Sequence, residues 1–250
     1  MRTASVVEAL GLERAPELVA IVGGGGKSSL MFDLAQALAG RVVMTTTTRI
    51  FAAQMSQAEE ACTLADENWC ERLDEFDSSL LMVGRVEGDR AVGVPAELPA
   101  EILARPGVDW VVVEADGSRM RPVKAPASHE PVVPDQTDLL IPVVGIDALS
   151  GPVSDVAHQP EQVSRITGLA PEEILTPEAL ASLLTSSQGG LKNAAQNVRV
   201  AVLINKVESA SQLDDARQVA RGVLQNARVG RVAIGALRGK VPSDWEVWTR

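Results

Sequence analysis

The sequence predicts an α/β fold, with a mainly parallel sheet and helices on both of its faces. Short apolar runs, rich in β-branched residues and bounded by Gly, Pro or polar residues, alternate with segments of helical periodicity. Most of these runs are continuously apolar, as is typical of strands buried on both faces of a parallel sheet. The predicted strands are Leu18–Val22, Arg41–Thr45, Ser79–Val83, Trp110–Val113, Leu139–Val144, Val198–Ile204 and Val229–Ile234.

Three helices are predicted between these strands. The first covers Ser28–Ala39, with apolar residues at helical spacing, and is expected to stop at Gly40. The second covers Pro177–Leu184, with Thr176 as its N-cap. The third carries an apolar stripe within Leu213–Leu224.

The 250 residues are expected to form a single domain, 1–250, with a mostly helical insertion at 145–197, where no run resembles a strand. Hydrophobic residues make up 46% of the chain, enough for a substantial core. The net charge of -10 argues against binding to nucleic acid or to an anionic membrane. No apolar stretch has the length of a signal peptide core or a membrane span, so a cytoplasmic location is expected.

The strongest chemical signal is a glycine loop between the first predicted strand and the first predicted helix. It consists of Gly23, Gly24, Gly25, Gly26, Lys27, Ser28 and Ser29. Consecutive glycines let several backbone N–H groups converge on one anion, and the helix N-terminus adds partial positive charge. Lys27 is expected to reach the β- and γ-phosphates and Ser28 to place its hydroxyl on Mg²⁺. Although Ile21 stands where the usual pattern has its first glycine, the loop predicts a P-loop NTPase-like nucleotide-binding domain.

Two carboxylates follow the predicted strand Trp110–Val113. Glu114 and Asp116 lie two residues apart, so an extended chain points both side chains the same way. In phosphate-loop proteins an acid at such a strand end holds Mg²⁺ or its waters. The run Thr45–Thr48 ends the second predicted strand and contributes Thr46 as a further candidate metal ligand, followed by Arg49 as a candidate charge stabiliser.

A third motif, Asn205-Lys206-Val207-Glu208, follows the strand Val198–Ile204. Guanine-binding NTPases carry Asn-Lys-x-Asp at this place in the chain order, and their carboxylate accepts hydrogen bonds from guanine. Glu208 supplies the acceptor with one methylene more. The motif favours GTP slightly and leaves ATP open.

The segment after Asp116 carries a basic cluster in an otherwise acidic chain. Arg119, Arg121 and Lys124 can bind an anionic second substrate or a phosphorylated cofactor, because guanidinium groups match phosphate oxygens. His129 and His158 are further candidates for an acid, a base or a ligand. The candidate catalytic residues are therefore Lys27, Glu114, Asp116 and Arg119, and the candidate ligands of Mg²⁺ are Ser28, Thr46, Glu114 and Asp116.

In this order, the motifs resemble those of the YqeC family of accessory proteins for selenium-dependent molybdenum hydroxylases. The resemblance is carried by Ile21–Ser29, Val43–Ile50, Val113–Pro134, Val144–Gly151 and Ile204–Glu208, and its most specific part is EADGSRMRPVKAPASHEPVVP. It implies a P-loop protein that assists the maturation of such a hydroxylase, with the apo-hydroxylase or a phosphorylated cofactor as partner.

Three functions are consistent with these observations. The first is a Mg²⁺-dependent enzyme that hydrolyses GTP or ATP or transfers a phosphoryl or nucleotidyl group during metal-cofactor maturation. The second is a nucleotide-gated switch or chaperone that docks on the apo-hydroxylase with little turnover. The third is a small-molecule kinase whose anionic acceptor is held by the basic cluster.

Overall fold

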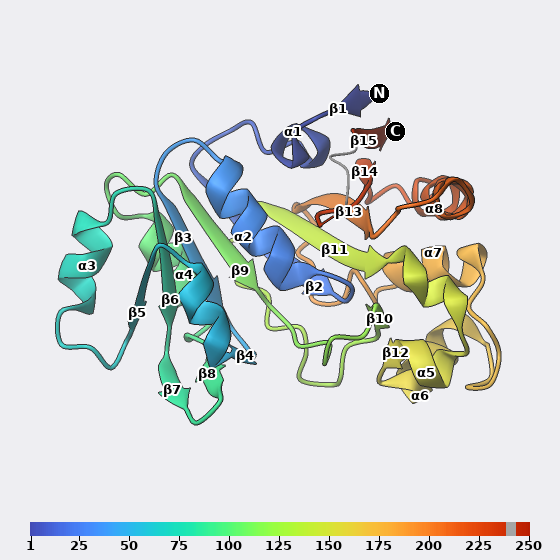
Figure 1. Ribbon diagram of the computed structural model, residues 1–250, viewed down its shortest axis with the longest axis horizontal. Coiled ribbons are helices and arrows are strands. Elements are labelled where there is room, and N and C mark those ends of the chain that lie inside the picture. The colour runs from blue at the N-terminus through green and yellow to red at the C-terminus, as the bar shows by residue number, and fades with distance from the viewer. Residues whose placement is uncertain (239–243) are drawn as a thin grey trace.

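The computed structural model describes residues 1–238 and 244–250, and a large sheet runs through its centre (Figure 1). Within these described residues the sheet has ten strands. They are β1 (Arg2–Thr3), β2 (Glu17–Gly23), β3 (Val42–Thr46), β5 (Glu60–Thr63), β6 (Ser79–Val83), β9 (Trp110–Glu114), β11 (Leu139–Gly145), β13 (Arg199–Asn205), β14 (Arg231–Ile234) and β15 (Trp245–Thr249). Their order across the sheet is β1-β15-β14-β13-β11-β2-β9-β3-β6-β5.

The prediction of a mainly parallel sheet is confirmed. All seven predicted strands are present, with ends that differ from the prediction by at most two residues. Every neighbouring pair from β14 to β5 is parallel, whereas β15 runs antiparallel to both β14 and β1. The edge strands β1 and β5 were not predicted, nor was β15, which lies between β1 and β14.

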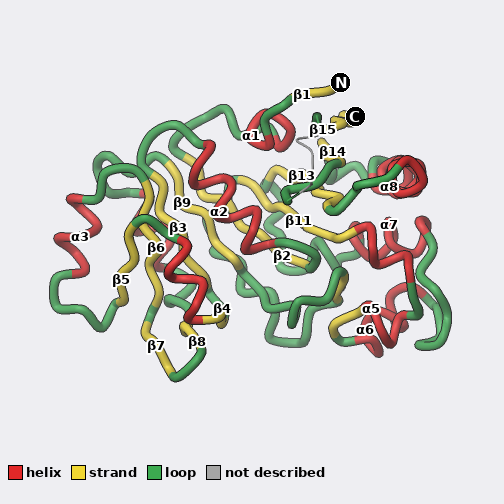
Figure 2. The backbone as a smooth tube through the Cα atoms, viewed as in Figure 1, coloured by secondary structure: helices red, strands yellow, loops and turns green. Residues whose placement is uncertain are grey.

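Smaller elements lie outside the central sheet (Figure 2). A second, antiparallel sheet consists of β4 (Arg49–Phe51), β8 (Arg90–Val92) and β7 (Arg85–Glu87). Two short strands, β10 (Val123–Lys124) and β12 (Ala157–His158), pair in parallel. Two 3₁₀ helices, η1 and η2, cover Ala52–Gln57 and Ile146–Ser150.

Helices pack against both faces of the central sheet, as predicted. They are α1 (Val6–Leu10), α2 (Lys27–Ala37), α3 (Trp69–Glu75), α4 (Leu98–Leu103), α5 (Val153–Val156), α6 (Pro160–Thr167), α7 (Pro177–Thr185) and α8 (Ala210–Val223). Successive side chains of a strand point to opposite faces. In β2, Val19 and Ile21 pack with α1 and α2, whereas Ala20 and Val22 pack with α7 and α8. The helices α3 and α4 join the second face through Leu18.

Helix ends follow local signals in one case and tertiary contacts in another. The Thr176 hydroxyl accepts a hydrogen bond of 3.2 Å from the Ala179 N–H, the predicted N-cap of α7. In contrast, α2 ends at Ala37, two residues before the predicted end. Gly40 instead takes φ 93° in the following turn. There a Cβ would lie 2.2 Å from Asp109 Oδ2.

The segment 145–197 contains η2, α5, α6 and α7, together with the two-residue strand β12. Its buried side chains, including Leu180 and Leu184 of α7, share one apolar cluster with Ala216 and Val219 of α8. No helix within 1–238 or 244–250 combines the length and the apolar character needed to cross a membrane.

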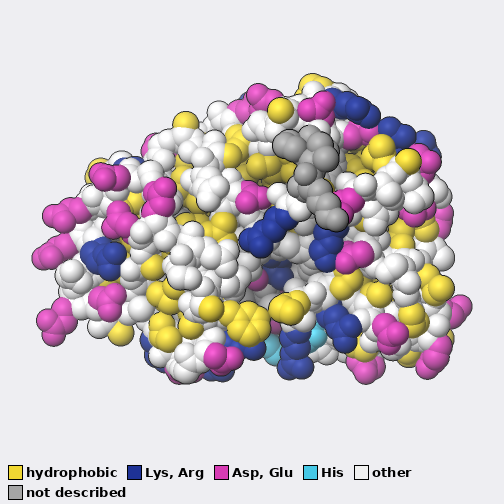
Figure 3. All heavy atoms as spheres, in the orientation of Figure 1, with side chains coloured by type: hydrophobic (Ala, Val, Ile, Leu, Met, Phe, Trp, Pro, Cys, Tyr) yellow, Lys and Arg dark blue, Asp and Glu magenta, His cyan; other side chains and the backbone are white. Residues whose placement is uncertain are grey.

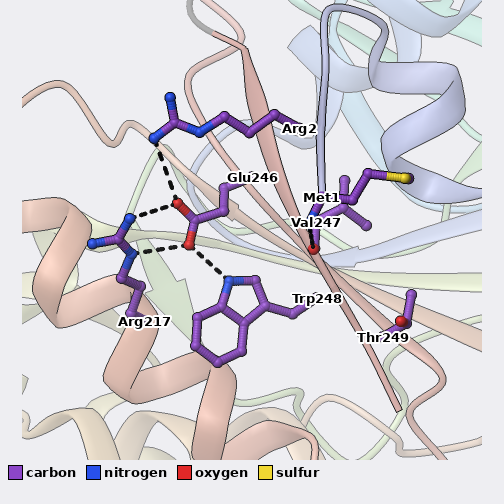
Figure 4. A pocket seen from close by; sticks show the side chains of 7 residues that line it. All are labelled: Met1, Arg2, Arg217, Glu246, Val247, Trp248 and Thr249. Carbon is purple, nitrogen blue, oxygen red and sulfur yellow. Dashed lines mark hydrogen bonds and ion pairs between the residues drawn. The ribbon is translucent and has the colours of Figure 1, made fainter.

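The two ends of the chain meet at one edge of the sheet (Figure 1). There the Glu246 carboxylate accepts hydrogen bonds from Arg217 Nε (2.9 Å) and Nη2 (2.8 Å) and from Trp248 Nε1 (2.8 Å) (Figure 4). Hydrogen bonding to Arg217 lowers the pKa of Glu246 to about 2. These contacts tie β15 to α8 beside an open hollow at the edge of the sheet.

Candidate functional site

The three predicted motifs meet at the carboxyl ends of adjacent strands. β2 lies between β9 and β11, and β11 is followed by β13. Glu114 is in register with Ile21, and Asn205 is in register with Gly145. The carboxyl edge of a parallel sheet, where neighbouring connections diverge, is the usual ligand site of open α/β proteins. The topology therefore brings the glycine loop, the acidic strand end and the Asn-Lys motif to one place.

The glycine loop packs tightly against the loops that surround it. Gly23, Gly25 and Gly26 have φ values of 98°, 75° and 133°, which favour glycine. A Cβ on Gly25 would lie 2.1 Å from Gly145 N, and one on Gly24 would lie 2.7 Å from Arg121 O. Glycine is therefore required here by close backbone packing as well as by conformation.

The backbone N–H groups of the loop divide into two sets. Those of Gly23, Gly24 and Gly25 donate to Asp116, to Val143 O and to Arg121 O, respectively. Those of Gly26, Lys27, Ser28 and Ser29 have no acceptor within 1–238 and 244–250. The second set surrounds the N-terminus of α2, where backbone donors and the helix dipole together favour an anion.

Lys27 lies at the centre of the site and is buried. Its ammonium donates a hydrogen bond of 2.7 Å to Gly23 O. It also lies 3.4 Å from Asp116 Oδ1 and 3.7 Å from Glu114 Oε1. The structure therefore brings together three of the four candidate catalytic residues.

Glu114 connects this lysine to Ser28. Its Oε2 accepts a hydrogen bond of 2.6 Å from the Ser28 hydroxyl. Burial raises the pKa of Glu114, although Lys27 and Ser28 act in the opposite direction. Thr46 donates a 2.8 Å hydrogen bond to the backbone oxygen of Glu114 and not to its carboxylate. Among the candidate metal ligands, Ser28 and Glu114 are thus in direct contact.

Lys124 and Glu130 belong to the same buried cluster. Lys124 Nζ lies 2.7 Å from Glu130 Oε2 and 3.4 Å from Asp116 Oδ2, with a side-chain exposure of 1%. Burial raises the pKa of Glu130, but the hydrogen bond and charge of Lys124 outweigh it, so the pKa is lowered. The cluster thus holds two lysines and three carboxylates, Glu114, Asp116 and Glu130.

The predicted basic cluster is therefore split. Arg119 and Arg121 are exposed, and Arg121 donates to the backbone oxygen of Asp155, whereas Lys124 points inward. An available signal was the apolar pair Val123 and Ala125 on either side of Lys124, which is typical of a buried segment. Burial together with Lys124 and Arg119 lowers the pKa of His158, whose strand β12 pairs with β10. His129 is exposed.

The Asn-Lys motif supports the glycine loop from the other side. Asn205 is buried, and its Nδ2 donates a 2.7 Å hydrogen bond to Gly25 O while its Oδ1 accepts one of 3.0 Å from Leu237 N. Lys206 Nζ lies 2.7 Å from Asp147 Oδ2. Glu208 is exposed and contributes its backbone N–H to Gln212 Oε1.

Charge is distributed unevenly over the surface. On the face that carries α2, Lys and Arg side chains surround a hollow near the centre, whereas acidic side chains gather around α3 (Figure 3). Arg49 pairs with Glu87 at 3.3 Å on the smaller sheet.

In the described part of the chain, no cluster of three or more His, Cys, Asp or Glu residues is arranged to hold a metal by itself. A metal bound here would need other oxygen ligands, such as hydroxyls, water or phosphate.

Comparison with known proteins identifies relatives of this chain. The family model described as YqeC protein matches residues 19–161, which contain the glycine loop and the whole buried cluster. The chain is also 33% identical over 211 residues to the uncharacterized protein YqeC of Escherichia coli (strain K12), in an alignment that covers 79% of this chain and 78% of that protein.

Proposed function

The chain belongs to the YqeC family, and from this premise we propose that it binds a nucleoside triphosphate with Mg²⁺ at the glycine loop and acts in the maturation of a selenium-dependent molybdenum hydroxylase. The observation that carries the phosphate part is the position of Lys27, which lies beside Gly23 O and between Glu114 and Asp116 at the start of α2. The hydroxylase part rests on the family resemblance alone.

The donors at the start of α2 support phosphate binding. Four backbone N–H groups, from Gly26 to Ser29, have no acceptor in the described parts of the chain, and one buried ammonium lies next to them. Lys27 already makes long contacts of 3.4 and 3.7 Å with two carboxylates, so a phosphate oxygen can compete for it. On binding, Lys27 would turn from Gly23 O toward the phosphates and neutralise part of their charge.

The residues present also fit a magnesium ion. Ser28 and Glu114 offer a hydroxyl and a carboxylate 2.6 Å apart, and Mg²⁺ prefers oxygen ligands. The buried cluster has one more carboxylate than it has lysines, so a cation is electrostatically favoured beside it. When bound, Mg²⁺ would stabilise the charge of the phosphates. Of the two carboxylates beside Lys27, Glu114 would hold the metal with Ser28, and Asp116 would be left to orient an attacking water.

Titration calorimetry with GTP and with ATP, each with and without Mg²⁺, tests the phosphate part. We expect Mg²⁺-dependent binding of at least one of the two nucleotides. Because a charged hydrogen bond contributes about 1.5–3 kcal/mol, Lys27→Met should weaken the affinity by roughly 10- to 100-fold. Ser28→Ala should reduce the dependence on Mg²⁺.

Two variants serve as matched controls for these substitutions. Arg85→Ala removes an exposed positive charge on β7, and Ser182→Ala removes an exposed hydroxyl on α7. Both should bind the nucleotide as the wild type does. Absence of binding by the wild type, or an affinity that Lys27→Met leaves unchanged, would overturn the phosphate part.

The hydroxylase part is tested separately, with a purified apo-hydroxylase of the selenium-dependent class. We expect a complex with this chain whose affinity differs between the GTP- and GDP-loaded protein, or between ATP and ADP if adenine is preferred. No complex in any nucleotide state would contradict the hydroxylase part and leave the phosphate part standing. If the complex is tight and the protein hydrolyses little nucleotide, the nucleotide-gated switch is favoured over the Mg²⁺-dependent enzyme.

A further inference from the structure

Asn205, the last residue of β13, is buried beside the glycine loop. Its Nδ2 donates a hydrogen bond of 2.7 Å to Gly25 O, and its Oδ1 accepts one of 3.0 Å from Leu237 N. A backbone carbonyl can only accept and a backbone N–H can only donate, so the two contacts fix the orientation of the amide. The donor end of the Asn205 side chain is therefore directed at the glycine loop.

The oxygen that Asn205 holds belongs to the peptide between Gly25 and Gly26. This peptide is trans, so its C=O and N–H groups point in opposite directions. Because Asn205 binds the C=O group, the N–H group of Gly26 points away from Asn205. That N–H group has no acceptor within 1–238 and 244–250, and it is one of the donors at the start of α2. The hydrogen bond from Asn205 thus sets the direction of a donor of the proposed phosphate site.

The peptide between Gly25 and Gly26 depends on such an anchor. Both residues have a positive φ, 75° and 133°, and neither has a Cβ that would restrict rotation of the peptide between them. A rotation by half a turn would direct the Gly26 N–H away from a phosphate. The amide of Asn205 also occupies the space beside Gly26, where a Cβ would lie 2.4 Å from Asn205 Nδ2.

We propose that Asn205 is a positioning residue of the phosphate site, which keeps the Gly26 N–H directed at a bound phosphate and has no contact with the base. This inference rests on the proposed nucleotide binding. It assigns Asn205 to the phosphates, although the Asn-Lys motif was expected to recognise the base. The contribution of Asn205 is then the same for any triphosphate with Mg²⁺, including inorganic tripolyphosphate.

Titration calorimetry with a ligand that has a base and one that has none tests this role. Asn205→Leu keeps a branched side chain of similar shape and removes both hydrogen bonds. We expect it to weaken the binding of Mg²⁺-GTP, or of Mg²⁺-ATP if the wild type prefers it, by roughly 10- to 100-fold, as for the loss of one hydrogen bond to a charged group. The affinity for Mg²⁺-tripolyphosphate should fall by the same factor.

Asn226→Leu is the matched control for this substitution. Asn226, in the turn after α8, also donates to a backbone oxygen, Thr185 O at 3.3 Å, and accepts from a backbone N–H, that of Arg228 at 2.9 Å. It has no contact with the glycine loop, so the variant should bind both ligands as the wild type does.

Nuclear magnetic resonance of the ¹⁵N-labelled protein separates positioning from a general loss of structure. In the wild type, the amide resonances of Gly26, Ser28 and Ser29 should shift when Mg²⁺-tripolyphosphate binds. In Asn205→Leu, saturated with the same ligand, the Gly26 resonance should lose most of its shift. The shifts of Ser28 and Ser29 should remain, because α2 still presents their N–H groups.

A second variant supplies the same test if Asn205→Leu does not fold. Asn205→Asp keeps the shape of the side chain and an acceptor for Leu237 N. Its ionised carboxylate has no proton to donate to Gly25 O, so the Gly26 resonance should again lose its response to the ligand.

The outcomes separate this inference from the proposed function. If the wild type binds neither nucleotide, the proposed function fails. If the wild type binds a nucleotide but Asn205→Leu weakens only that nucleotide and not tripolyphosphate, Asn205 acts on the base and the inference is overturned. Unchanged affinities in the variant, or a wild-type Gly26 resonance that does not respond to tripolyphosphate, would overturn it as well. So would a Gly26 shift that persists in the variant, or the loss of all three shifts together, which would indicate a structural role alone.

Discussion

Ser28 and Glu114 are 86 residues apart in the sequence, and the Ser28 hydroxyl donates a hydrogen bond of 2.6 Å to Glu114 Oε2. The contact forms because β2 and β9 are adjacent parallel strands, so the helix that follows β2 begins beside the end of β9. It places a hydroxyl, a carboxylate and the Lys27 ammonium in one buried site. The ionisation of Glu114 provides the first prediction.

Glu114→Gln should gain stability relative to the wild type as the pH rises. Burial raises the pKa of Glu114 above its ordinary 4.5. Between pH 4.5 and this raised pKa, the folded protein therefore binds more protons than the unfolded chain. The contribution of Glu114 to the free energy of unfolding therefore decreases as the pH rises from 4.5 to its raised pKa. Urea denaturation from pH 4 to pH 8 measures the difference. A difference that is independent of pH would contradict the assignment.

Glu130→Gln should show the opposite dependence. Lys124 lowers the pKa of Glu130 below 4.5 in spite of the carboxyl's burial. The stability that Glu130 contributes is present above 4.5 and is lost as the pH falls through its lowered pKa. The variant should therefore be less stable than the wild type at neutral pH and approach it in acid. The same urea denaturation series measures how the free energy of unfolding of both variants, Glu114→Gln and Glu130→Gln, depends on pH. Each variant is therefore a control for the other.

Gly24→Ala should destabilise the protein although Gly24 has no positive φ. Its Cβ would lie 2.7 Å from Arg121 O and 3.0 Å from Val123 N, and backbone atoms cannot move aside as a flexible side chain can. We expect a loss of about 1–3 kcal/mol in the free energy of unfolding, the usual range for overpacking. Gly117→Ala is the control, since a Cβ there meets nothing within 4 Å, and it should stay within about 0.5 kcal/mol of the wild type. Equal effects at the two positions would refute the packing argument.

Glu246→Gln should weaken the contact between β15 and α8 at neutral pH. Hydrogen bonding to Arg217 lowers the pKa of Glu246 from 4.5 to about 2, so its contribution is present above 4.5 and is lost as the pH falls toward 2. The midpoint of urea denaturation should be lower in the variant than in the wild type at pH 7. The difference between the two midpoints should decrease as the pH falls from 5 to 2. Glu87→Gln, which removes exposed pairs with Arg49 and Arg85, should show little effect at any pH. If the difference between the midpoints stays constant in acid, the pair of Glu246 with Arg217 is not its cause.

Local sequence signals predicted the strands of the central sheet and the place of the glycine loop. Continuous apolar runs such as Trp110–Val113 and Leu139–Val144 are typical of strands that are buried on both faces of a sheet, and both runs are buried in the structure. The glycines after Val22 mark the turn from β2 to α2, because three of the four take a positive φ. These signals depend on the residue itself and on a few neighbours along the chain.

Features that depend on distant residues were not predictable in the same way. The short edge strand β1 exists because β15 offers it a partner, and its two residues carry no periodic pattern. The end of α2 at Ala37 goes with a turn in which Gly40 closely approaches Asp109. Arg121 and Lys124 are both basic and close in sequence, yet one is exposed and the other buried.

By itself, the sequence determined the α/β architecture and located the glycine loop, Glu114 and Asp116 at strand ends, since hydrophobic periodicity and glycine conformation are local properties of the chain. Only the tertiary structure decided that Asp116 lies between Lys27 and Lys124, and that Glu130 pairs with Lys124. The physical reason is that a buried charge is tolerated only beside compensating charges. Which charges those are depends on the order of strands in the sheet and on the folding of the 117–131 loop against it.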